Sequence, residues 1–255
     1  MASTQTTSTV PVMFHDRCVV ATDLHCDGGA RRLVWLKSLL LRCQQLSSPL
    51  LILGDLFDLW RGPGQIKASD TRLELEALKM AVRSGTAISL LPGNRDFLLD
   101  QSFQDETGVE VLGDAVDMRI GGLRWHFSHG DLFGTEDQGY QRLRKFLRHP
   151  VSRHLLLSLP SGVSKKLAGG IRKGSRRSIA RKTTISMQPD LRSVEALVGS
   201  GYDRVVCGHF HKERFEQIHC AGRQGEFRIL EPFEDRGAYL YLDGPAVKLE
   251  WLGDH

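Results

Sequence analysis

The stretch Leu50-Leu51-Ile52-Leu53-Gly54-Asp55-Leu56-Phe57-Asp58 joins an apolar run to two carboxylates. The four leading apolar residues predict a buried strand, and the residues after it place Asp55 at the C-terminal end of that strand. Four other apolar runs end in similar polar clusters, which are Asp23-Leu24-His25, Gly93-Asn94-Arg95-Asp96, Ser128-His129-Gly130-Asp131 and Gly208-His209-Phe210-His211. Oxygen and imidazole ligands gathered from several strand ends predict a site for two divalent transition metals.

Each cluster taken singly has a simpler explanation. An Asp after a strand is commonly a turn residue or a helix N-cap. A single His at a strand edge commonly packs there through a hydrogen bond. Chance is a poor explanation for five separate turns that all carry metal-binding residue types, so we interpret the clusters as one site.

The apolar pattern predicts an α/β fold. Strands are expected at 18–22, 50–53 and 87–91, and the segments between them have apolar residues at helical spacing. This alternation predicts parallel pairing. Gly121-Gly122 separates two alternating runs and predicts a β-hairpin, and further short strands are expected at 205–208, 228–230, 238–242 and 247–251. Together these elements predict two mixed sheets that pack face to face and are flanked by helices.

The bulk composition fits one globular domain. A chain of 255 residues with 41% hydrophobic and 25% charged residues can bury a single large core. We see no apolar run that would span a bilayer and no signal peptide. The Ser/Thr-rich residues 1–16 predict a disordered tail before a domain at 17–255. Five scattered cysteines without C-x-x-C spacing favour reduced thiols in the cytoplasm.

The segment from Gln138 to Pro189 contains no Asp or Glu, and all its charged residues are Lys or Arg. Apolar residues alternate with these cations at roughly helical spacing, which predicts amphipathic helices with a basic face. One interpretation is a solvated insertion that packs on the core. Another is a cap that grips an anionic ligand with an apolar body or rests on anionic lipid. A nucleic-acid patch is disfavoured because Tyr140 and Phe146 are its only aromatic residues.

The order of the five clusters resembles that of the calcineurin-like metallophosphoesterases. The sequence is similar in particular to the family of UDP-2,3-diacylglucosamine diphosphatases of lipid A biosynthesis, over about residues 17–243. This likeness is carried by Gly54 through Trp60, Arg95 where most of the superfamily has His, the block Gly93 through Leu99, His129 through Asp137, and Tyr140 through Arg144 with the basic stretch after it. The resemblance implies a calcineurin-like metallophosphoesterase fold with a helical cap insertion at about 138–189.

The resemblance also implies seven metal ligands. Asp55 would bridge two cations, Asp23, His25 and His211 would complete one site, and Asn94, His129 and His209 would complete the other. This mixture of carboxylate, amide and imidazole suits Mn²⁺, with Fe or Zn as alternatives, because Mg²⁺ avoids imidazole and Ca²⁺ requires oxygen ligands. The catalytic residues are expected to be Asp55, Asn94, Arg95 and His129.

Substrate contacts are implied in the same way for Asn94, Arg95, Asp137, Ser175, Lys182 and His209. Ile179 stands where the family has Asn, which removes one polar contact. Arg95 is permanently charged, so it can hold phosphate but is a poor proton donor; this suits a leaving group that needs no protonation. Asp58, Asp96 and Asp131 are expected to support these residues without binding metal, with a helix cap as the alternative role for Asp96.

The expected activity is that of a phosphoric-anhydride hydrolase with two metals. It would convert UDP-2,3-diacylglucosamine to UMP and 2,3-diacylglucosamine 1-phosphate, in the cytoplasm and peripherally on an anionic inner-membrane surface. We expect no nucleic-acid partner and no obligate protein partner. One alternative is a related metallophosphoesterase that acts on another nucleotide diphosphate or phosphodiester. The other is a non-catalytic protein that binds lipid surfaces or nucleic acid, and the presence of all seven predicted ligands argues against it.

Overall fold

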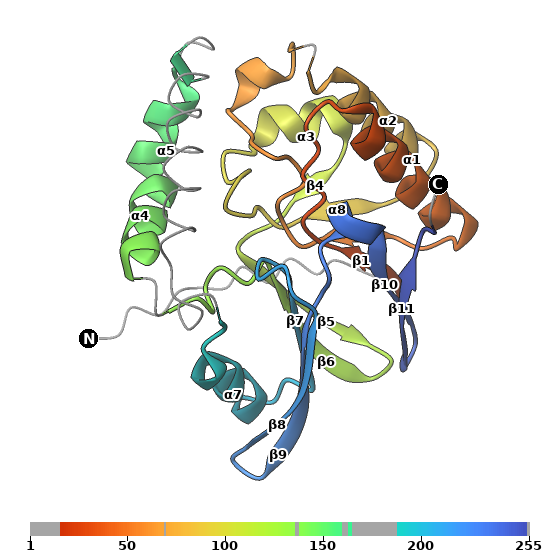
Figure 1. Ribbon diagram of the computed structural model, residues 1–255, viewed down its shortest axis with the longest axis vertical. Helices are drawn as coiled ribbons and strands as arrows, with labels where there is room; N and C mark the ends of the chain where they lie inside the picture. The colour runs from red at the N-terminus through yellow and green to blue at the C-terminus, as the bar shows by residue number, and fades with distance from the viewer. Residues whose placement is uncertain (1–15, 69, 136–137, 160–162, 165–187, 254–255) are drawn as a thin grey trace.

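The computed structural model describes residues 16–68, 70–135, 138–159, 163–164 and 188–253 (Figure 1). Several expectations therefore lie outside the described residues. They concern the tail 1–15, the predicted substrate contacts Asp137, Ser175 and Lys182, the departure at Ile179, and much of the predicted insertion. These stay predictions.

The first sheet has six strands in the order β11-β10-β1-β2-β3-β4. Its parallel strands are β1 (Arg17–Ala21), β2 (Leu50–Ile52), β3 (Ile88–Leu90) and β4 (Glu110–Val111). Two antiparallel strands extend it, β10 (Ala238–Asp243) and β11 (Ala246–Trp251). The helices between the parallel strands are α1 (Ala30–Gln45), α2 (Arg72–Arg83) and α3 (Gln101–Thr107). The predicted strand–helix alternation and parallel pairing are confirmed.

The second sheet has five strands in the order β5-β6-β7-β9-β8. These are β5 (Ala115–Ile120), β6 (Leu123–Ser128), β7 (Arg204–Cys207), β8 (Arg214–Cys220) and β9 (Arg223–Ile229). The hairpin predicted at Gly121-Gly122 joins β5 to β6, and β6, β7 and β9 are parallel. The sequence did not predict β4, β8, α3, the turn η1 (Pro63–Gln65), α7 (Leu191–Gly199) or the four-residue helix α8 (Phe233–Arg236).

The two sheets pack face to face between helices. Along β1, Val19 and Ala21 pack in one apolar cluster with α1 and α2, whereas Cys18 and Val20 pack in another with residues of the second sheet. A third cluster lies between α7 and the outer face of the second sheet. A strand buried on both faces needs apolar residues throughout, which explains the continuous apolar runs. The prediction of two mixed sheets flanked by helices is confirmed.

Two helices of the predicted insertion, α4 (Gln138–Arg148) and α5 (Pro150–Leu157), stand beside this core (Figure 1). The basic face predicted for them is wrong in part. Arg144 and Arg148 turn toward the core, with side chains only 11% and 15% exposed. Large apolar side chains face outward instead, namely Leu143, Phe146, Val151 and Leu155. Helical spacing fixes which residues share a face, but it does not fix which face meets the core.

Among the described residues, no helix combines the length and apolarity that a membrane crossing requires. All five cysteines are free, and four of them are buried. The thiols therefore contribute to packing as small apolar side chains.

Candidate metal centre

The five polar clusters meet where strand ends of the two sheets come together. Asp23, Asp55 and Asn94 follow the parallel strands β1, β2 and β3, while His129 and His209 follow the parallel strands β6 and β7. Parallel strands end at the same edge of a sheet, and that edge is where α/β proteins place their sites. Backbone hydrogen bonds join the loops: His25 N donates to Asp55 O at 2.9 Å, and Gly208 N donates to His129 O at 2.9 Å.

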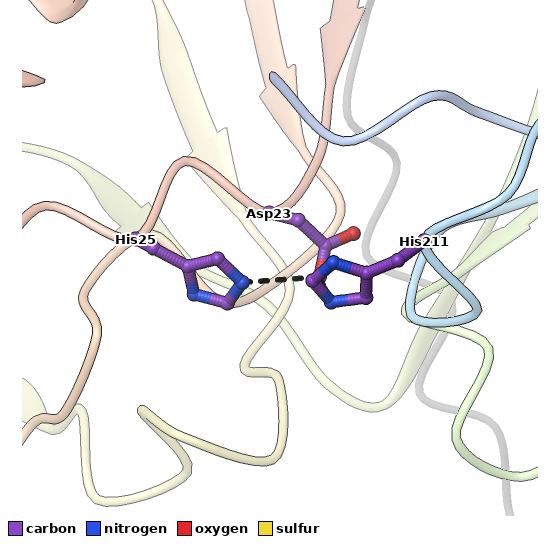
Figure 2. Close-up of side chains that lie close together, drawn as sticks. All are labelled: Asp23, His25 and His211. Atoms are coloured by element: carbon purple, nitrogen blue, oxygen red, sulfur yellow. Dashed lines mark ion pairs between the residues drawn. The ribbon is translucent and has the colours of Figure 1, made fainter. Parts of the chain in front are cut away.

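Asp23, His25 and His211 form a first cluster, whose candidate ligand atoms all lie within 4.8 Å of one another. Nε2 of His211 is 3.4 Å from Asp23 Oδ1, and Nε2 of His25 is 3.8 Å from the same oxygen. Figure 2 shows the two imidazoles converging on the carboxylate, with Asp23 and His25 from the loop after β1 and His211 from the loop after β7. The rings are stacked with an interplanar angle of 11°.

Asp23, Asp55 and His129 form a second cluster by the same distance. Asn94 connects it to His209, since Asn94 Oδ1 lies 2.9 Å from His129 Nε2 and 3.0 Å from His209 Nδ1. The structure thus brings all seven predicted ligands together. Asp23 belongs to both clusters, so the centre has a shared carboxylate there as well as the predicted bridge at Asp55, whose bridging role stays a prediction.

Buried polar atoms without partners indicate that this centre needs a cation. Asp23 Oδ1 and both ring nitrogens of His25 are buried and, among the described residues, have no hydrogen-bond partner. Leaving a buried polar atom unpaired costs about 1–3 kcal/mol, and a metal ion between Asp23 Oδ1 and His25 Nε2, which lie 3.8 Å apart, would satisfy both of these atoms. The donor set contains oxygen and imidazole nitrogen but no sulfur, as Mn²⁺, Fe²⁺ and Zn²⁺ sites allow. The residues present therefore fit divalent metals.

The backbone at these ligands is strained. Asp23, His25, Asp55, His209 and His211 all have left-handed conformations, with φ between 47° and 72°. For residues with a Cβ such conformations cost of order 1–3 kcal/mol each and occur mainly at functional sites. The strain lets the chain turn sharply after each strand, so that every side chain points back toward the shared edge.

Two glycines permit the close approach of these loops. A Cβ on Gly93 would lie 2.2 Å from Asp55 Oδ1, and a Cβ on Gly208 would lie 1.9 Å from Thr22 Oγ1 and 2.6 Å from Asp23 Oδ2. Neither space can hold a methyl group, because real Cβ contacts stay beyond 3.0 Å. Because Gly93 and Gly208 have no side chain, they leave the space that the Asp55 and Asp23 carboxylates occupy.

Burial dominates the electrostatics of the centre. It raises the pKa of Asp55 to about 7, with nearby Asp96 and Asp23 adding to the rise and His129 opposing it. Burial also lowers the pKa of His25 to about 2 and, with the charge of His129, that of His209 to about 4. These two imidazoles are neutral near pH 7, which leaves a ring nitrogen free to bind a metal.

Charge outweighs burial at two other groups. Burial alone would raise the pKa of Asp23, but the neighbouring His129, His211 and His25 together lower it. Burial alone would lower the pKa of His129, but Asp55, Asp23 and Asp131 raise it. Asp23 is therefore held as the carboxylate, the form in which it can bind a cation.

Asp96 and Asp58 hold the loops that carry the ligands. Asp96 is fully buried and accepts backbone hydrogen bonds from Gly93 N and Leu56 N, both at 2.7 Å, so it ties together the loops after β2 and β3. It does not cap a helix. Asp58 Oδ1 accepts a 2.7 Å bond from Arg95 Nη1, while Arg95 Nε lies 3.5 Å from Asp55 Oδ2. Asp58 thereby aims the Arg95 guanidinium at the centre.

Asp131 anchors α4 to the centre. Its Oδ2 accepts a 2.6 Å bond from Arg144 Nε and a 2.9 Å bond from Tyr140 OH. Arg148 Nη2 donates to the carbonyls of Pro92 and Gly93, at 3.0 and 2.7 Å, directly before Asn94. Through these hydrogen bonds α4 holds in place the two loops that carry His129 and Asn94. The cationic pattern marked these arginines, but their anchoring role was not predicted.

One acidic residue beside the first cluster was missed altogether. Glu234 Oε1 lies 3.5 Å from His25 Nε2 and 3.8 Å from His211 Nδ1. It sits in the four-residue helix α8, where no periodic pattern or polar cluster of the sequence marks it. Its contact with the centre depends on the antiparallel return of the chain to β1, which local sequence does not reveal.

Comparison with known proteins gives the family that the order of the five polar clusters resembles. The family model described as calcineurin-like phosphoesterase matches residues 17–213. A protein of Pseudomonas putida (strain F1) named UDP-2,3-diacylglucosamine hydrolase is 32% identical over 202 residues, which is 78% of this chain and 83% of that protein. A protein of Azotobacter vinelandii with the same name is 32% identical over 234 residues, 91% of this chain and 96% of that protein.

Among solved structures, an archaeal phosphodiesterase is 13% identical to this chain, with a TM-score of 0.48 and coverage of 92% of this chain and 99% of that one. That likeness is too distant to add support. The extent of the family match and the identity to the curated relatives are sufficient by themselves: the chain belongs to the calcineurin-like phosphoesterase family and is a hydrolase of that family.

Proposed function

We propose that this enzyme hydrolyses the diphosphate of UDP-2,3-diacylglucosamine to UMP and 2,3-diacylglucosamine 1-phosphate, with two divalent cations, of which Mn²⁺ is our choice. The observation that carries the proposal is the convergence of Asp23, His25, His211, Asp55 and His129 at one strand edge, with orphaned polar atoms among them. The relatives named UDP-2,3-diacylglucosamine hydrolase, which match this chain over most of its length, support the substrate.

The residues of the centre suit a metal-assisted attack on phosphorus. Asp23, His25 and His211 would hold one cation, and Asn94, His129 and His209 the other, with Asp55 between them. When bound, such a pair of cations supplies Lewis acidity that neutralises phosphoryl oxygens and activates water. The neutral imidazoles and the ionised Asp23 present the protonation states that binding requires.

Arg95 would position the substrate. Its side chain is 33% exposed, is oriented by Asp58 and borders Asp55. A guanidinium can bind two phosphate oxygens at once, and its permanent charge makes it a poor proton donor. This combination suits cleavage of a phosphoanhydride, because either product, UMP or the sugar 1-phosphate, can depart as a phosphate anion without needing a proton.

The substrate assignment is tested with the purified full chain, EDTA-treated and reloaded with Mn²⁺. We expect UMP release from UDP-2,3-diacylglucosamine, and at least tenfold slower release from UDP-N-acetylglucosamine, whose only acyl group is a short N-acetyl. Equal turnover of the two compounds would favour the alternative of a metallophosphoesterase that acts on soluble nucleotide diphosphates. Intact Mn²⁺ content without release of UMP would reject hydrolysis of this substrate.

Large apolar side chains are exposed on the helices α4 and α5. Leu143, Phe146, Val151 and Leu155 are each about half or more exposed on α4 and α5, and Phe146 reaches 66%. Several large exposed apolar side chains on neighbouring helices are typical of surfaces that contact lipid or another apolar partner. We infer that these four side chains face acyl chains and that the enzyme works peripherally on the cytoplasmic face of the inner membrane.

Flotation with vesicles that contain phosphatidylglycerol tests the lipid contact. We expect the protein to float with these vesicles, and Phe146→Ser with Leu155→Ser to reduce the floating fraction at least threefold. Met80→Ser is the matched control, since Met80 is 68% exposed on α2, away from the cap. Equal flotation of the Phe146→Ser, Leu155→Ser variant and the control would show that these exposed apolar side chains do not hold the protein on the membrane.

A further inference from the structure

Glu234 points a carboxylate at the histidines of the first cluster, yet none of the polar clusters contains it. Its Oε1 is 3.5 Å from His25 Nε2 and 3.8 Å from His211 Nδ1, and its side chain is only 19% exposed. These separations are longer than hydrogen bonds, and closing the second one requires a movement of about 1 Å. The carboxylate is therefore poised beside both rings.

The backbone fixes the place of Glu234 next to Asp23. Glu234 N donates to Asp23 O at 3.2 Å, and Phe233 N donates to Thr22 O at 2.9 Å. The Phe233 side chain is buried and meets the Trp35 ring edge-on, with the centroids 5.9 Å apart. The start of α8 is thereby held against the end of β1, the strand that delivers Asp23 and His25.

Arg32 fixes the direction of the carboxylate. On α1, Arg32 pairs through Nη2 with the other oxygen, Oε2, of Glu234. Its Nη1 donates to Leu24 O at 3.2 Å, between the two ligands of the same loop. A guanidinium anchored at both ends leaves Oε1 as the oxygen that faces the imidazoles.

His211 needs such a partner more than the other ligands do. It is the most exposed of the seven, with a side chain 37% exposed, and it lies on a loop with left-handed backbone. One ring nitrogen, Nε2, faces Asp23, and the other, Nδ1, faces Glu234. A histidine that binds metal through one nitrogen nearly always donates its other N–H to a carboxylate, carbonyl or water, which fixes the tautomer and the ring orientation.

We propose that Glu234, held by Arg32, is a positioning residue of the metal centre that accepts the Nδ1–H of His211 and so directs Nε2 toward a divalent cation at Asp23. This inference rests on the metal-binding part of the proposed function and is independent of the substrate. Glu234 does not touch the reacting atoms in this account. It acts through His211, and its loss should weaken one cation site and spare the other.

Calorimetric titration of Mn²⁺ into the EDTA-treated full chain measures this effect. We expect two binding steps in the wild type and a loss of about 10–100-fold in affinity for one of them in Glu234→Ala, the usual effect of removing such a partner. Glu234→Gln, which keeps an acceptor oxygen, should lose less, and Arg32→Met should lose an intermediate amount. Asp235→Ala is the matched control, because Asp235 is an exposed carboxylate on the same short helix.

Nitrogen NMR of the histidine rings in the Zn²⁺-loaded protein reads the position directly. We expect His211 to carry its proton on Nδ1 in the wild type and to lose this fixed state in Glu234→Ala and Arg32→Met. Wild-type affinity at both steps in Glu234→Ala, or an unchanged His211 signal in both variants, overturns the inference.

The same experiments separate this inference from the proposed function. A wild-type protein that binds no divalent cation overturns both. A wild-type protein that binds two cations but releases no UMP rejects only the substrate. If Glu234→Ala does not fold by circular dichroism, the Glu234→Gln titration and the Arg32→Met ring signal decide the question.

Discussion

Replacing Asp96 with Asn should loosen the metal centre without removing any predicted ligand. Asp96 Oδ1 accepts from Gly93 N at 2.7 Å, and Oδ2 accepts from Leu56 N at 2.7 Å, inside a fully buried site. Asn has nearly the same shape, but it offers one oxygen and one NH₂ group. One of the two loops therefore loses its acceptor and meets a donor instead.

The magnitude follows from those two bonds. A hydrogen bond to a charged group contributes about 1.5–3 kcal/mol, and a buried donor left unpaired costs about 1–3 kcal/mol, so with overlap between these terms we expect a loss of about 3 kcal/mol in the free energy of unfolding. Asp55 and Asn94 lie on the two loops, and a misplacement of about 1 Å can lower the rate roughly 100-fold.

Urea denaturation followed by circular dichroism measures the stability, in EDTA so that metal binding does not add to it. Asp105→Asn is the control, because Asp105 is exposed on α3 and its change should stay within about 0.5 kcal/mol. If Asp96→Asn lost less than about 1 kcal/mol and kept its Mn²⁺ affinity, the loops would be held by something other than this carboxylate.

Two further substitutions test how the loop that carries Asn94 is held. Arg148→Met removes the bonds to the carbonyls of Pro92 and Gly93, so we expect the free energy of unfolding to fall by about 2 kcal/mol and the turnover to fall with it. Lys145→Met, exposed on the same helix, should change neither, and equal effects of the two would refute the anchoring role. Gly93→Ala puts a Cβ 2.2 Å from Asp55 Oδ1 and should abolish paired Mn²⁺ binding, whereas Gly113→Ala, with nothing within 4 Å, should bind as the wild type does. Wild-type Mn²⁺ binding by Gly93→Ala would show that the loops can make room for the added methyl group without loss of the metal centre.

The sequence predicted the metal centre because metal-binding residue types directly follow apolar strands. Leu50 to Leu53 had to be a buried strand because both of its faces meet apolar neighbours, and Asp55 had to appear at its end. Parallel strands end at one edge of a sheet, so strand order predicts that the clusters after β1, β2 and β3 meet and that those after β6 and β7 meet. The contact between the two groups depends on how the two sheets pack, which strand order does not give. The hairpin at Gly121-Gly122 was predictable because these two glycines separate two alternating apolar runs.

What sequence missed depends on contacts between distant segments. Glu234 reaches the centre only because Phe233 N and Glu234 N bond to the end of β1. The direction of Arg144 and Arg148 was mistaken because Asp131 and the carbonyl of Gly93 attract them inward, and helical periodicity contains no information about that attraction. The short strand β4 carries two residues and has no periodic signal of its own.

We propose that the seven predicted ligand side chains hold two divalent cations. Anomalous diffraction at the manganese edge, from crystals of the full chain grown with Mn²⁺, locates these cations. We expect two peaks, one bounded by Asp23, His25 and His211 and the other by Asn94, His129 and His209, with Asp55 in contact with both. Peaks elsewhere on the protein, or none among these seven residues, would refute this arrangement.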